Sequence, residues 1–321
     1  MDDPHQRFEI LDSHLGEGTY GKVVEGFDRL LNKKVAIKKV MASIPSEGLN
    51  KSYIGMVGIH LTTIREVKIM MELKHENLMG IIAIYRDGDF INIVMDLMKT
   101  DLKAIITSKV RLQESHIKCI LYQILLGLEY LHKYSFAHRD LSTGNIFISA
   151  EGICKLADFG LSRQTILPPD ASTNYQRPEK MTHKVVTLWY RPPELLLGAD
   201  CYHTACDIWS VGCIFAEMIT GHPLFPGVNE IDQLSKIYKI TGTPSEENWP
   251  EAKRLPYYTE YSFSRGKEIE HFVPTLNLQA KDLLQRLIKL NPHERITATE
   301  ALKHEYFTTA QLPCKPSQLP I

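Results

Sequence analysis

Two short motifs carry the residue types that phosphoryl transfer needs. The first reads HRDLSTGN over residues 138–145, and DFG follows at residues 158–160. Asp140 would orient a substrate hydroxyl, while Asn145 and Asp158 would hold the Mg²⁺ ions that neutralise a nucleoside triphosphate. The expected chemistry is therefore transfer of a phosphoryl group to a hydroxyl.

A glycine-rich segment, GEGTYG over residues 16–21, fits the pattern G-x-G-x-x-G. By itself this pattern also fits a plain hairpin turn or a dinucleotide-binding fold, in which a helix follows at once. Here KVV at 22–24 and VAIK at 35–38 follow, which predicts strand, turn and strand. We therefore expect backbone amides that approach phosphates, with Lys38 as the lysine of the VAIK motif.

Lys38 needs an acidic partner to have a role, because a lone lysine is expected at the surface. Glu66, within TTIREV at residues 62–67, lies on the one helix expected in the strand-rich part of the chain. A solvated helix charge is the alternative reading of Glu66. We predict an ion pair that holds Lys38 against the α- and β-phosphates.

The order of the motifs is more specific than any one of them. The glycine-rich segment, the lysine, the helix glutamate, HRD-x₄-N, DFG and PPE at residues 192–194 follow one another along the chain. A lone HRD at residues 138–140 could be no more than a loop ion pair. Together the motifs predict one nucleotide-dependent phosphotransferase.

Composition excludes several other classes of protein. The 321 residues can bury one large core or two smaller ones, and 44% are hydrophobic. The net charge of −1 offers no overall attraction for nucleic acid or for an anionic membrane, so neither is an expected partner. No apolar run reaches the roughly 18 residues of a membrane helix, and the acidic N-terminus lacks a signal-peptide core. The six cysteines show no metal-site spacing, which favours reduced packing thiols of an intracellular protein.

The hydrophobic patterns predict two units. Short Val- and Ile-rich runs separated by turn signals predict a strand-rich unit over residues 8–97, with one helix at about 61–73. A larger helical unit is expected over residues 98–307 and an extended, proline-containing tail over 308–321. Within the helical unit, apolar periodicity predicts helices at residues 116–133, 207–221, 230–241 and 279–290. A cleft between the two units is where a small ligand is expected.

From about residue 8 to residue 307, the chain resembles eukaryotic protein kinases, and within them the cyclin-dependent kinases. The likeness is carried by LGEGTYG (15–21), IRE (64–66), VVTLWYR (185–191), DIWSVGCI (207–214) and ITGTP (240–244). It implies a bilobal α+β protein kinase fold, with a β-rich N-terminal lobe, an α-helical C-terminal lobe and an ATP cleft between them. Residues 227–250, RITA at 295–298 and QLP at 318–320 are most similar to the subtype that activates other cyclin-dependent kinases and phosphorylates the RNA polymerase II tail.

The resemblance implies an activity and partners. The chain would transfer the γ-phosphate of ATP, with Mg²⁺, to Ser/Thr-Pro sites, on the polymerase C-terminal repeats or on other cyclin-dependent kinases. A cyclin-type regulatory subunit and a further assembly factor would be its partners, and its location would be nuclear by family analogy. In the family, the carbonyl of the residue matching Val186 turns toward Arg191. A substrate amide after the phosphoacceptor would then lack a partner, and proline has no N–H to lose.

The resemblance also assigns residues to the site. The nucleotide-binding set is Leu15, Gly16, Glu17, Gly18, Thr19, Tyr20, Gly21, Val23, Ala36, Lys38, Met95, Asp96, Met98 and Asp101. Within that set, Met95 would be the gatekeeper behind adenine, and Asp101 would reach the ribose. Backbone groups of Asp96 and Met98 would meet adenine. The catalytic set is Asp140, Lys38, Glu66 and Thr187, with Thr187 and Asp140 implying serine/threonine substrates.

The same resemblance implies control by phosphorylation. Thr182, within MTHK at residues 181–184, falls where an activating phosphothreonine belongs. The cations expected around that dianion are Arg65, Arg139 and Arg163. An unmodified loop hydroxyl is the alternative reading of Thr182. Thr19 and Tyr20 lie where inhibitory phosphates would repel the phosphates of ATP.

Three features depart from the family pattern. Ser142-Thr143-Gly144 replaces the usual Lys-Pro-x, which removes a cation from the γ-phosphate. Loss of one such electrostatic donor can cost on the order of 10²-fold in rate. The segment from Asp158 to Thr182 and the segment from Lys38 to Glu66 are both longer than usual. The second of these leaves the identity of the cyclin open.

Two other functions compete with a cyclin-dependent kinase. A mitogen-activated-type kinase that works alone would need Thr-x-Tyr in its activation segment, where this chain has Thr182-His183-Lys184. A pseudokinase that binds nucleotide and scaffolds partners has Ser142 as its only support. The catalytic and metal residues already named argue against it.

Overall fold

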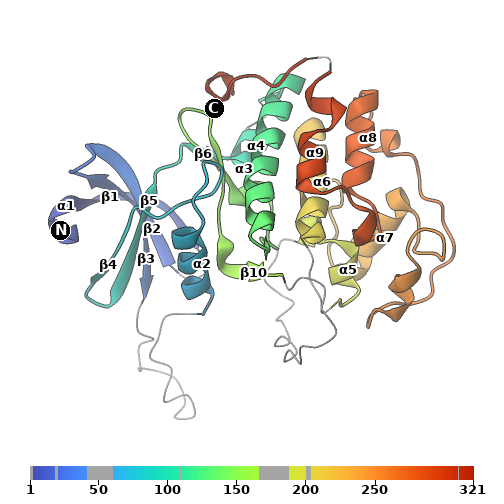
Figure 1. The fold of residues 1–321 in the computed structure, drawn as a ribbon, viewed down its shortest axis with the longest axis horizontal. Coiled ribbons are helices and arrows are strands. Elements are labelled where there is room, and N and C mark those ends of the chain that lie inside the picture. Colours follow the sequence, from blue (N-terminus) through green and yellow to red (C-terminus); the bar gives the residue numbers. More distant parts are fainter. Residues whose placement is uncertain are drawn as a thin grey trace, which may run out of the picture. The chain divides into compact units, whose positions relative to one another are not determined.

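The computed structural model describes residues 3–18, 21–41, 61–108, 110–165, 188–199, 204–309 and 311–321. It divides into two compact units (Figure 1). The first unit is Met1–Lys99 together with Ala157–Leu161, and the second is Thr100–Leu156 together with Ser162–Ile321. The short segment around Asp158 therefore belongs to the first unit, although its sequence neighbours belong to the second. The first unit is rich in strands and the second in helices, as the α+β prediction requires.

The first unit is built on one antiparallel sheet. Its elements are α1 (Pro4–Arg7), β1 (Phe8–Gly18), β2 (Gly21–Asp28), β3 (Lys33–Met41), α2 (Leu61–Glu72), β4 (Ala83–Asp87), β5 (Phe90–Asp96) and the 3-10 helix η3 (Phe159–Leu161). The strand order is β1-β2-β3-β5-β4. Val35, Ile37 and Val94 are fully buried in its core. Gly88, with φ +57°, makes the predicted turn between β4 and β5.

The second unit holds the remaining elements. They are β6 (Thr100–Asp101), α3 (Leu102–Thr107), α4 (Glu114–Lys133), β7 (Phe136–Ala137), η2 (Thr143–Asn145), β8 (Ile146–Ile148), β9 (Cys154–Leu156), β10 (Arg163–Gln164), η4 (Leu188–Tyr190), α5 (Pro193–Leu196), α6 (Ala205–Thr220), α7 (Glu230–Thr241), η5 (Pro250–Arg254), η6 (Ile269–His271), α8 (Leu278–Leu287), η7 (Pro292–Glu294), α9 (Ala298–Leu302), η8 (Glu305–Phe307) and η9 (Pro316–Gln318). The helices predicted from periodicity correspond to α4, α6, α7 and α8, with ends shifted by a few residues.

Helix α6 is the centre of the second unit. It lies between α4 and α8 (Figure 1), and every residue from Cys206 to Met218 is buried. A helix that is apolar nearly all round is expected in a core, as its sequence predicted. Gly221, with φ +75°, ends it in a left-handed conformation that glycine adopts at little cost.

Side-chain caps set the starts of the next two long helices. The Asn229 side chain accepts the Asp232 amide before α7, and the Asn277 side chain accepts the Ala280 amide before α8. Each cap satisfies an amide that has no partner within its own helix. The local sequence therefore defines both helix starts.

The C-terminal residues pack on the second unit, although the sequence predicted only an extended tail. The Lys118 ammonium on α4 is 1% exposed and donates to the carbonyls of Thr309 and Gln311, both at 2.8 Å. The Cys314 amide donates to the Ser115 carbonyl at 3.1 Å. These bonds fasten the chain after η8 along α4.

The described cysteines are free thiols. Cys119, Cys154, Cys206 and Cys213 are buried, and Cys314 is half-buried, as expected of packing residues. Cys201 lies outside the described residues. Within the described ranges, no helix has the length and apolar character needed to cross a membrane.

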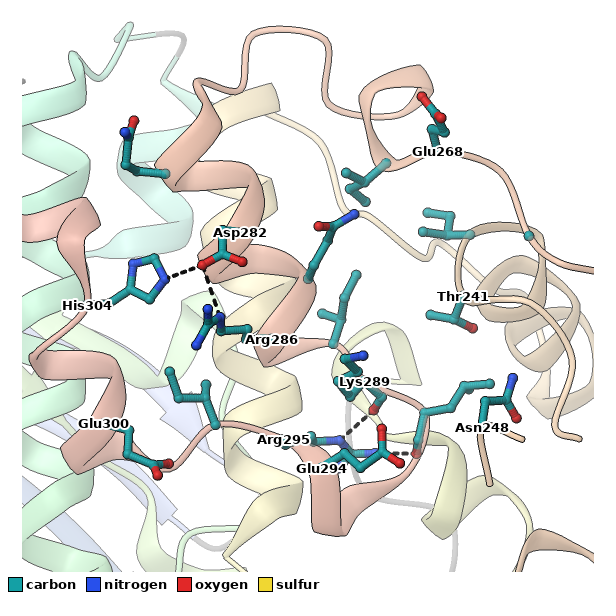
Figure 2. Close-up of a pocket in the computed structure, with 18 of the residues that line it drawn as sticks. Thr241, Asn248, Glu268, Asp282, Arg286, Lys289, Glu294, Arg295, Glu300 and His304 are labelled. Carbon is teal, nitrogen blue, oxygen red and sulfur yellow. Dashed lines mark hydrogen bonds and ion pairs between the residues drawn. The ribbon is translucent and has the colours of Figure 1, made fainter. Parts of the chain in front are cut away.

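A buried ion pair joins distant parts of the second unit. Arg295 donates to both carboxylate oxygens of Glu194 on α5, at 2.7 and 2.6 Å. Arg295 also donates to the Lys289 carbonyl at 2.8 Å (Figure 2) and lies 5.0 Å over the ring of Trp209. The Arg295 side chain is fully buried and that of Glu194 is 9% exposed, so neither charge has water as an alternative partner.

Replacing Arg295 with methionine should leave the Glu194 carboxylate buried without its cation. We expect a loss of about 3–5 kcal/mol in the free energy of unfolding, measured by urea denaturation. Lys68→Met, which removes one partner of an exposed ion pair, is the control and should change stability by less than about 1 kcal/mol. Adding Glu194→Leu to Arg295→Met should restore part of the loss. Equal effects of Arg295→Met and Lys68→Met would contradict this account.

Candidate active site

In the first unit, Lys38 and Glu66 form a largely buried ion pair. The Lys38 ammonium on β3 lies 2.8 and 2.7 Å from the two carboxylate oxygens of Glu66 on α2. Their side chains are 16% and 9% exposed. The ammonium is therefore held in one place, as a phosphate-binding cation must be.

Asp158 adds a second carboxylate near this pair. Burial raises the pKa of Glu66, the Lys38 charge works in the opposite direction, and the nearby Asp158 charge raises it further. Two carboxylates and one ammonium leave an excess of negative charge, which favours a further cation. Asp158 also has φ +65°, a strained conformation for a residue other than glycine and one that is common at functional sites.

Arg65 connects α2 to the segment that carries Asp158. Its guanidinium donates to the Gly160 carbonyl at 3.0 Å. The same residue was predicted from the sequence as a phosphothreonine ligand. Its structural contact shows that it also fixes the backbone beside Asp158.

The sheet of the first unit gathers four predicted nucleotide-binding residues on one face. Val23 on β2 is directly opposite Lys38 on β3, and Ala36 on β3 is directly opposite Met95 on β5. Lys38 and Ala36 are two positions apart on β3, and directly opposed antiparallel residues share a face. All four side chains therefore point to the same side of the sheet. Ala36 is buried, and Val23 and Met95 are half-buried.

The glycine-rich segment forms the ends of β1 and β2. Gly16 pairs with Val23 and Gly18 with Gly21, so strand follows strand and the dinucleotide-binding alternative is excluded. A side chain on Gly21 would collide with the Lys39 carbonyl oxygen, whereas one on Gly16 would meet nothing within 4 Å. The backbone at Gly16 is thus open to a ligand. Thr19 and Tyr20, and the side chain of Glu17, lie outside the described residues.

The other residues predicted to contact the nucleotide differ in exposure and in their hydrogen-bond partners. Leu15 is 44% exposed, Met98 is half-buried, and the Asp96 carboxylate pairs with Lys33 at 3.0 Å. In the second unit, Asp101 caps α3, because its carboxylate accepts the Ala104 amide at 2.8 Å. This helix-capping role was not foreseen from the sequence. The contacts of these residues with a nucleotide stay predictions.

In the second unit, a buried carboxylate holds the start of the catalytic loop. Asp207 on α6 is 1% exposed and accepts the backbone amides of His138 at 2.8 Å and Arg139 at 2.7 Å. The Nε2 atom of His132 lies 2.9 Å from the same carboxylate. Burial alone would raise the pKa of Asp207, but the His132 hydrogen bond and the nearby His138 and Arg139 amide hold it below its usual value.

Sequence reasoning gave Asp207 no role. The available signal was its position, since it is the only charged residue in the otherwise apolar run DIWSVGCI. A charge is rarely buried unless it is paired or hydrogen-bonded.

Asp140 and Asn145 lie within the loop that Asp207 holds. The Asn145 side-chain amide donates to the Asp140 carbonyl at 2.7 Å, and its backbone amide donates to the Ser142 carbonyl at 3.1 Å. Because its nitrogen is used in this way, the oxygen of the Asn145 side chain is the atom that would bind a cation. The Asp140 amide is 3.3 Å from Nδ1 of His138. The turn therefore fixes the backbone of both residues.

Asn145 and Asp158 fit the ligand chemistry of Mg²⁺. Both offer hard oxygen atoms, and Mg²⁺ usually takes one or two protein ligands together with phosphates and waters. Among the described residues, no group of three or more His, Cys, Asp or Glu side chains could hold a metal ion. The binding of Mg²⁺ by Asn145 and Asp158 stays a prediction.

Two of the three predicted phosphate-binding arginines belong to the second unit. Arg139 is 9% exposed with φ +73°, and Arg163 is exposed on β10. Arg163 pairs with Ala137 of β7, two residues before Arg139. Thr182 and Thr187 lie outside the described residues, so the role of the arginines around a phosphothreonine stays a prediction.

The hollow in Figure 2 is a different place from the predicted site. It is lined by residues of α8, α9 and the loops beside them, and Asp282 there contacts both His304 and Arg286. None of the predicted catalytic or nucleotide-binding residues lines it. We therefore do not assign phosphoryl transfer to this hollow.

Asp207→Asn should weaken the hold on the catalytic loop. An amide offers one acceptor oxygen in place of two, so at least one buried backbone N–H loses its partner. We expect kcat to fall by on the order of tenfold or more, with little change in the dissociation constant of ATP. Asp282→Asn, which alters a half-exposed carboxylate of the same unit, is the control. An unchanged kcat in Asp207→Asn would rule out the anchoring role.

Comparisons with known proteins agree with this geometry. The family model of the protein kinase domain matches residues 10–307. Cyclin-dependent kinase D-1 of Arabidopsis thaliana is 40% identical over 307 residues, which cover 95% of this chain and 72% of the relative. Cyclin-dependent kinase C-2 of the same plant is 39% identical over 332 residues, which cover 98% of this chain and 61% of the relative.

A solved structure gives the same result. A chain in the structure of the CAK complex from Chaetomium thermophilum bound to ATP-gamma-S has a TM-score of 0.84 and 34% identity, and the match covers 98% of this chain and 95% of that chain. The predicted kinase fold, with a β-sheet N-terminal lobe and a helical C-terminal lobe, is confirmed. The chain belongs to the protein kinases and, within them, to the cyclin-dependent kinases, as a serine/threonine protein kinase.

Proposed function

We propose that this kinase transfers the γ-phosphate of ATP to serine or threonine followed by proline, under the control of a cyclin-type subunit. The observation that carries the proposal is the buried Lys38–Glu66 ion pair. Glu66 lies on α2, and other residues of α2 form an exposed apolar face. A partner on that face would act on the helix that positions the phosphate-binding lysine.

The residues of the site would divide the chemistry as follows. Lys38 would bind the α- and β-phosphates, and Asp140 would orient the substrate hydroxyl for in-line attack. Asn145 and Asp158 would hold Mg²⁺, which neutralises charge on the β- and γ-phosphates when bound. Thr187 would accompany Asp140 at the phosphoacceptor.

Helix α2 has the surface expected of a partner-binding helix. Leu61, Ile64 and Met71 are 68%, 48% and 55% exposed. Their spacing of three and seven residues places them along one side of the helix. Ile64 and Met71 belong to the broad apolar side that the sequence pattern predicts for this helix, and within that side they are exposed whereas Ile69 and Met70 are buried. Exposed apolar residues that cluster on one helix face favour a protein partner there.

The subtype proposal draws on the relatives. Likeness to cyclin-dependent kinase D-1 and to a chain of the CAK complex supports substrates among other cyclin-dependent kinases and the RNA polymerase II repeats. We propose a further assembly factor as a second partner and a nuclear location on the same ground. The preference for proline rests on the resemblance, because the carbonyl of Val186 lies outside the described residues; the described contact of Arg191 is with Glu230 at 3.5 Å.

Phosphate transfer from radiolabelled ATP to a Ser-Pro heptad-repeat peptide tests the function. We expect transfer by the chain co-expressed with a cyclin and little by the chain alone. Asp140→Asn should abolish transfer while ATP still binds, because Asp140 acts on the substrate hydroxyl. Equal transfer with and without cyclin would contradict cyclin control. ATP binding without transfer under every condition would favour the pseudokinase alternative.

The missing lysine of the catalytic loop gives a separate prediction. Ser142→Lys should restore a cation near the γ-phosphate and raise kcat, by up to on the order of 10²-fold if that cation alone limits the rate. Ser142→Met, of similar length without the charge, is the matched control for packing, because Ser142 is 8% exposed. An unchanged kcat in Ser142→Lys would mean that another group or product release sets the rate.

A further inference from the structure

Thr143 occupies the position where the family has the proline of Lys-Pro-x. It begins η2, directly between Ser142 and the turn that ends at Asn145, and it is 1% exposed. Its hydroxyl oxygen lies 3.0 Å from the phenolic oxygen of Tyr190. A proline could not form this hydrogen bond, since it has no hydroxyl.

Tyr190 extends the contact to a buried carboxylate. Its hydroxyl donates to Glu217 on α6 at 2.6 Å, so the Thr143 hydroxyl is the donor in its contact with Tyr190. Tyr190 and Glu217 are 4% and 5% exposed. The three side chains thus form a hydrogen-bonded cluster away from water, where each bond matters because a lost partner is not replaced.

The cluster is rigid at its far end. The Tyr190 carbonyl accepts a hydrogen bond from Ser210 on α6 at 2.9 Å, so Tyr190 is bound to α6 through both its backbone and its side chain. Burial raises the pKa of Glu217, and the hydrogen bond from Tyr190 acts against that rise. The Tyr190 hydroxyl therefore stabilises the charged form of Glu217.

The catalytic loop is consequently attached to α6 at two points. Asp207 holds the amides of residues 138 and 139, and Glu217 holds Thr143 through Tyr190. The two carboxylates are ten residues apart, which is about 15 Å along a helix. Asp140 lies between the two attachment points in the sequence. A loop fixed on both sides loses little entropy when its central residue meets substrate.

We propose that Thr143 is a positioning residue for phosphoryl transfer, which fixes the loop around Asp140 and Asn145 through the Thr143–Tyr190–Glu217 cluster. The proposal rests on the kinase activity of the chain. It also gives the departure from Lys-Pro-x a physical meaning. The stiffness that proline gives the loop in relatives comes here from a hydroxyl that Tyr190 links to α6.

Thr143→Val keeps the shape of the side chain and removes the hydroxyl. In the cyclin-bound kinase, we expect kcat to fall about fivefold, the rate equivalent of one hydrogen bond, with KM for ATP within about twofold of wild type. Thr143→Ser should restore most of kcat. Thr241→Val removes a half-buried hydroxyl of the same unit outside the site and should leave kcat unchanged. Equal kcat in wild type and Thr143→Val would overturn the proposal.

A double-mutant cycle separates this role from a general loss of stability. Tyr190→Phe should also lower kcat, and the double variant should be no slower than the slower single variant, because both changes break one cluster. Additive losses would overturn the proposal.

Hydrogen exchange measured by mass spectrometry tests the proposal without enzyme activity. In Thr143→Val, exchange should rise in residues 140–145 and stay unchanged in β8. Unchanged exchange in residues 140–145 would overturn the positioning role. If exchange rises but the wild-type kinase transfers no phosphate, the proposed function fails while the loop attachment stands.

Discussion

The burial of two carboxylates on α6 is the constraint on which the catalytic loop depends. A helix as apolar as α6 can hold Asp207 and Glu217 in its buried stretch only if hydrogen bonds replace the water they lose. The partners come from the loop that carries Asp140 and from Tyr190. Because the loop supplies hydrogen bonds that a buried carboxylate needs, the same bonds fix the position of the loop. Removing either partner would leave an unsatisfied polar group in the core.

In the first unit, a sheet positions the charged residue Lys38. A lysine at the surface would be free to move, but β3 is flanked by β2 and β5, and its register is fixed along its whole length. That register places Lys38 opposite Val23 and two residues from Ala36, so one face of the sheet carries both the cation and the apolar residues. Glu66 then receives Lys38 from α2. The geometry follows from strand pairing and from one buried ion pair.

Charge balance explains several local features. Glu66 and Asp158 exceed Lys38 by one negative charge, which suits an Mg²⁺-dependent reaction. Ser142 supplies no cation, and its side chain is buried. Arg295 and Glu194, in contrast, neutralise one another inside the second unit and connect α5 with the segment after α8.

The motifs, the α+β class, the family and most helix positions could be predicted from the sequence. These follow from local signals, since periodicity, caps and glycine turns act within a few residues. It also predicted that Lys38 and Glu66 would meet, because motif order implied it. The sequence did not reveal the roles of Asp207, Glu217 and Thr143. It also did not reveal that Lys118 hydrogen-bonds the C-terminal residues and holds them against the second unit. Those roles depend on contacts between residues far apart in the chain, and only tertiary structure decides which buried polar group finds which partner. Ile64 and Met71 make the same point, because helical periodicity predicts an apolar side but not whether the protein itself covers it.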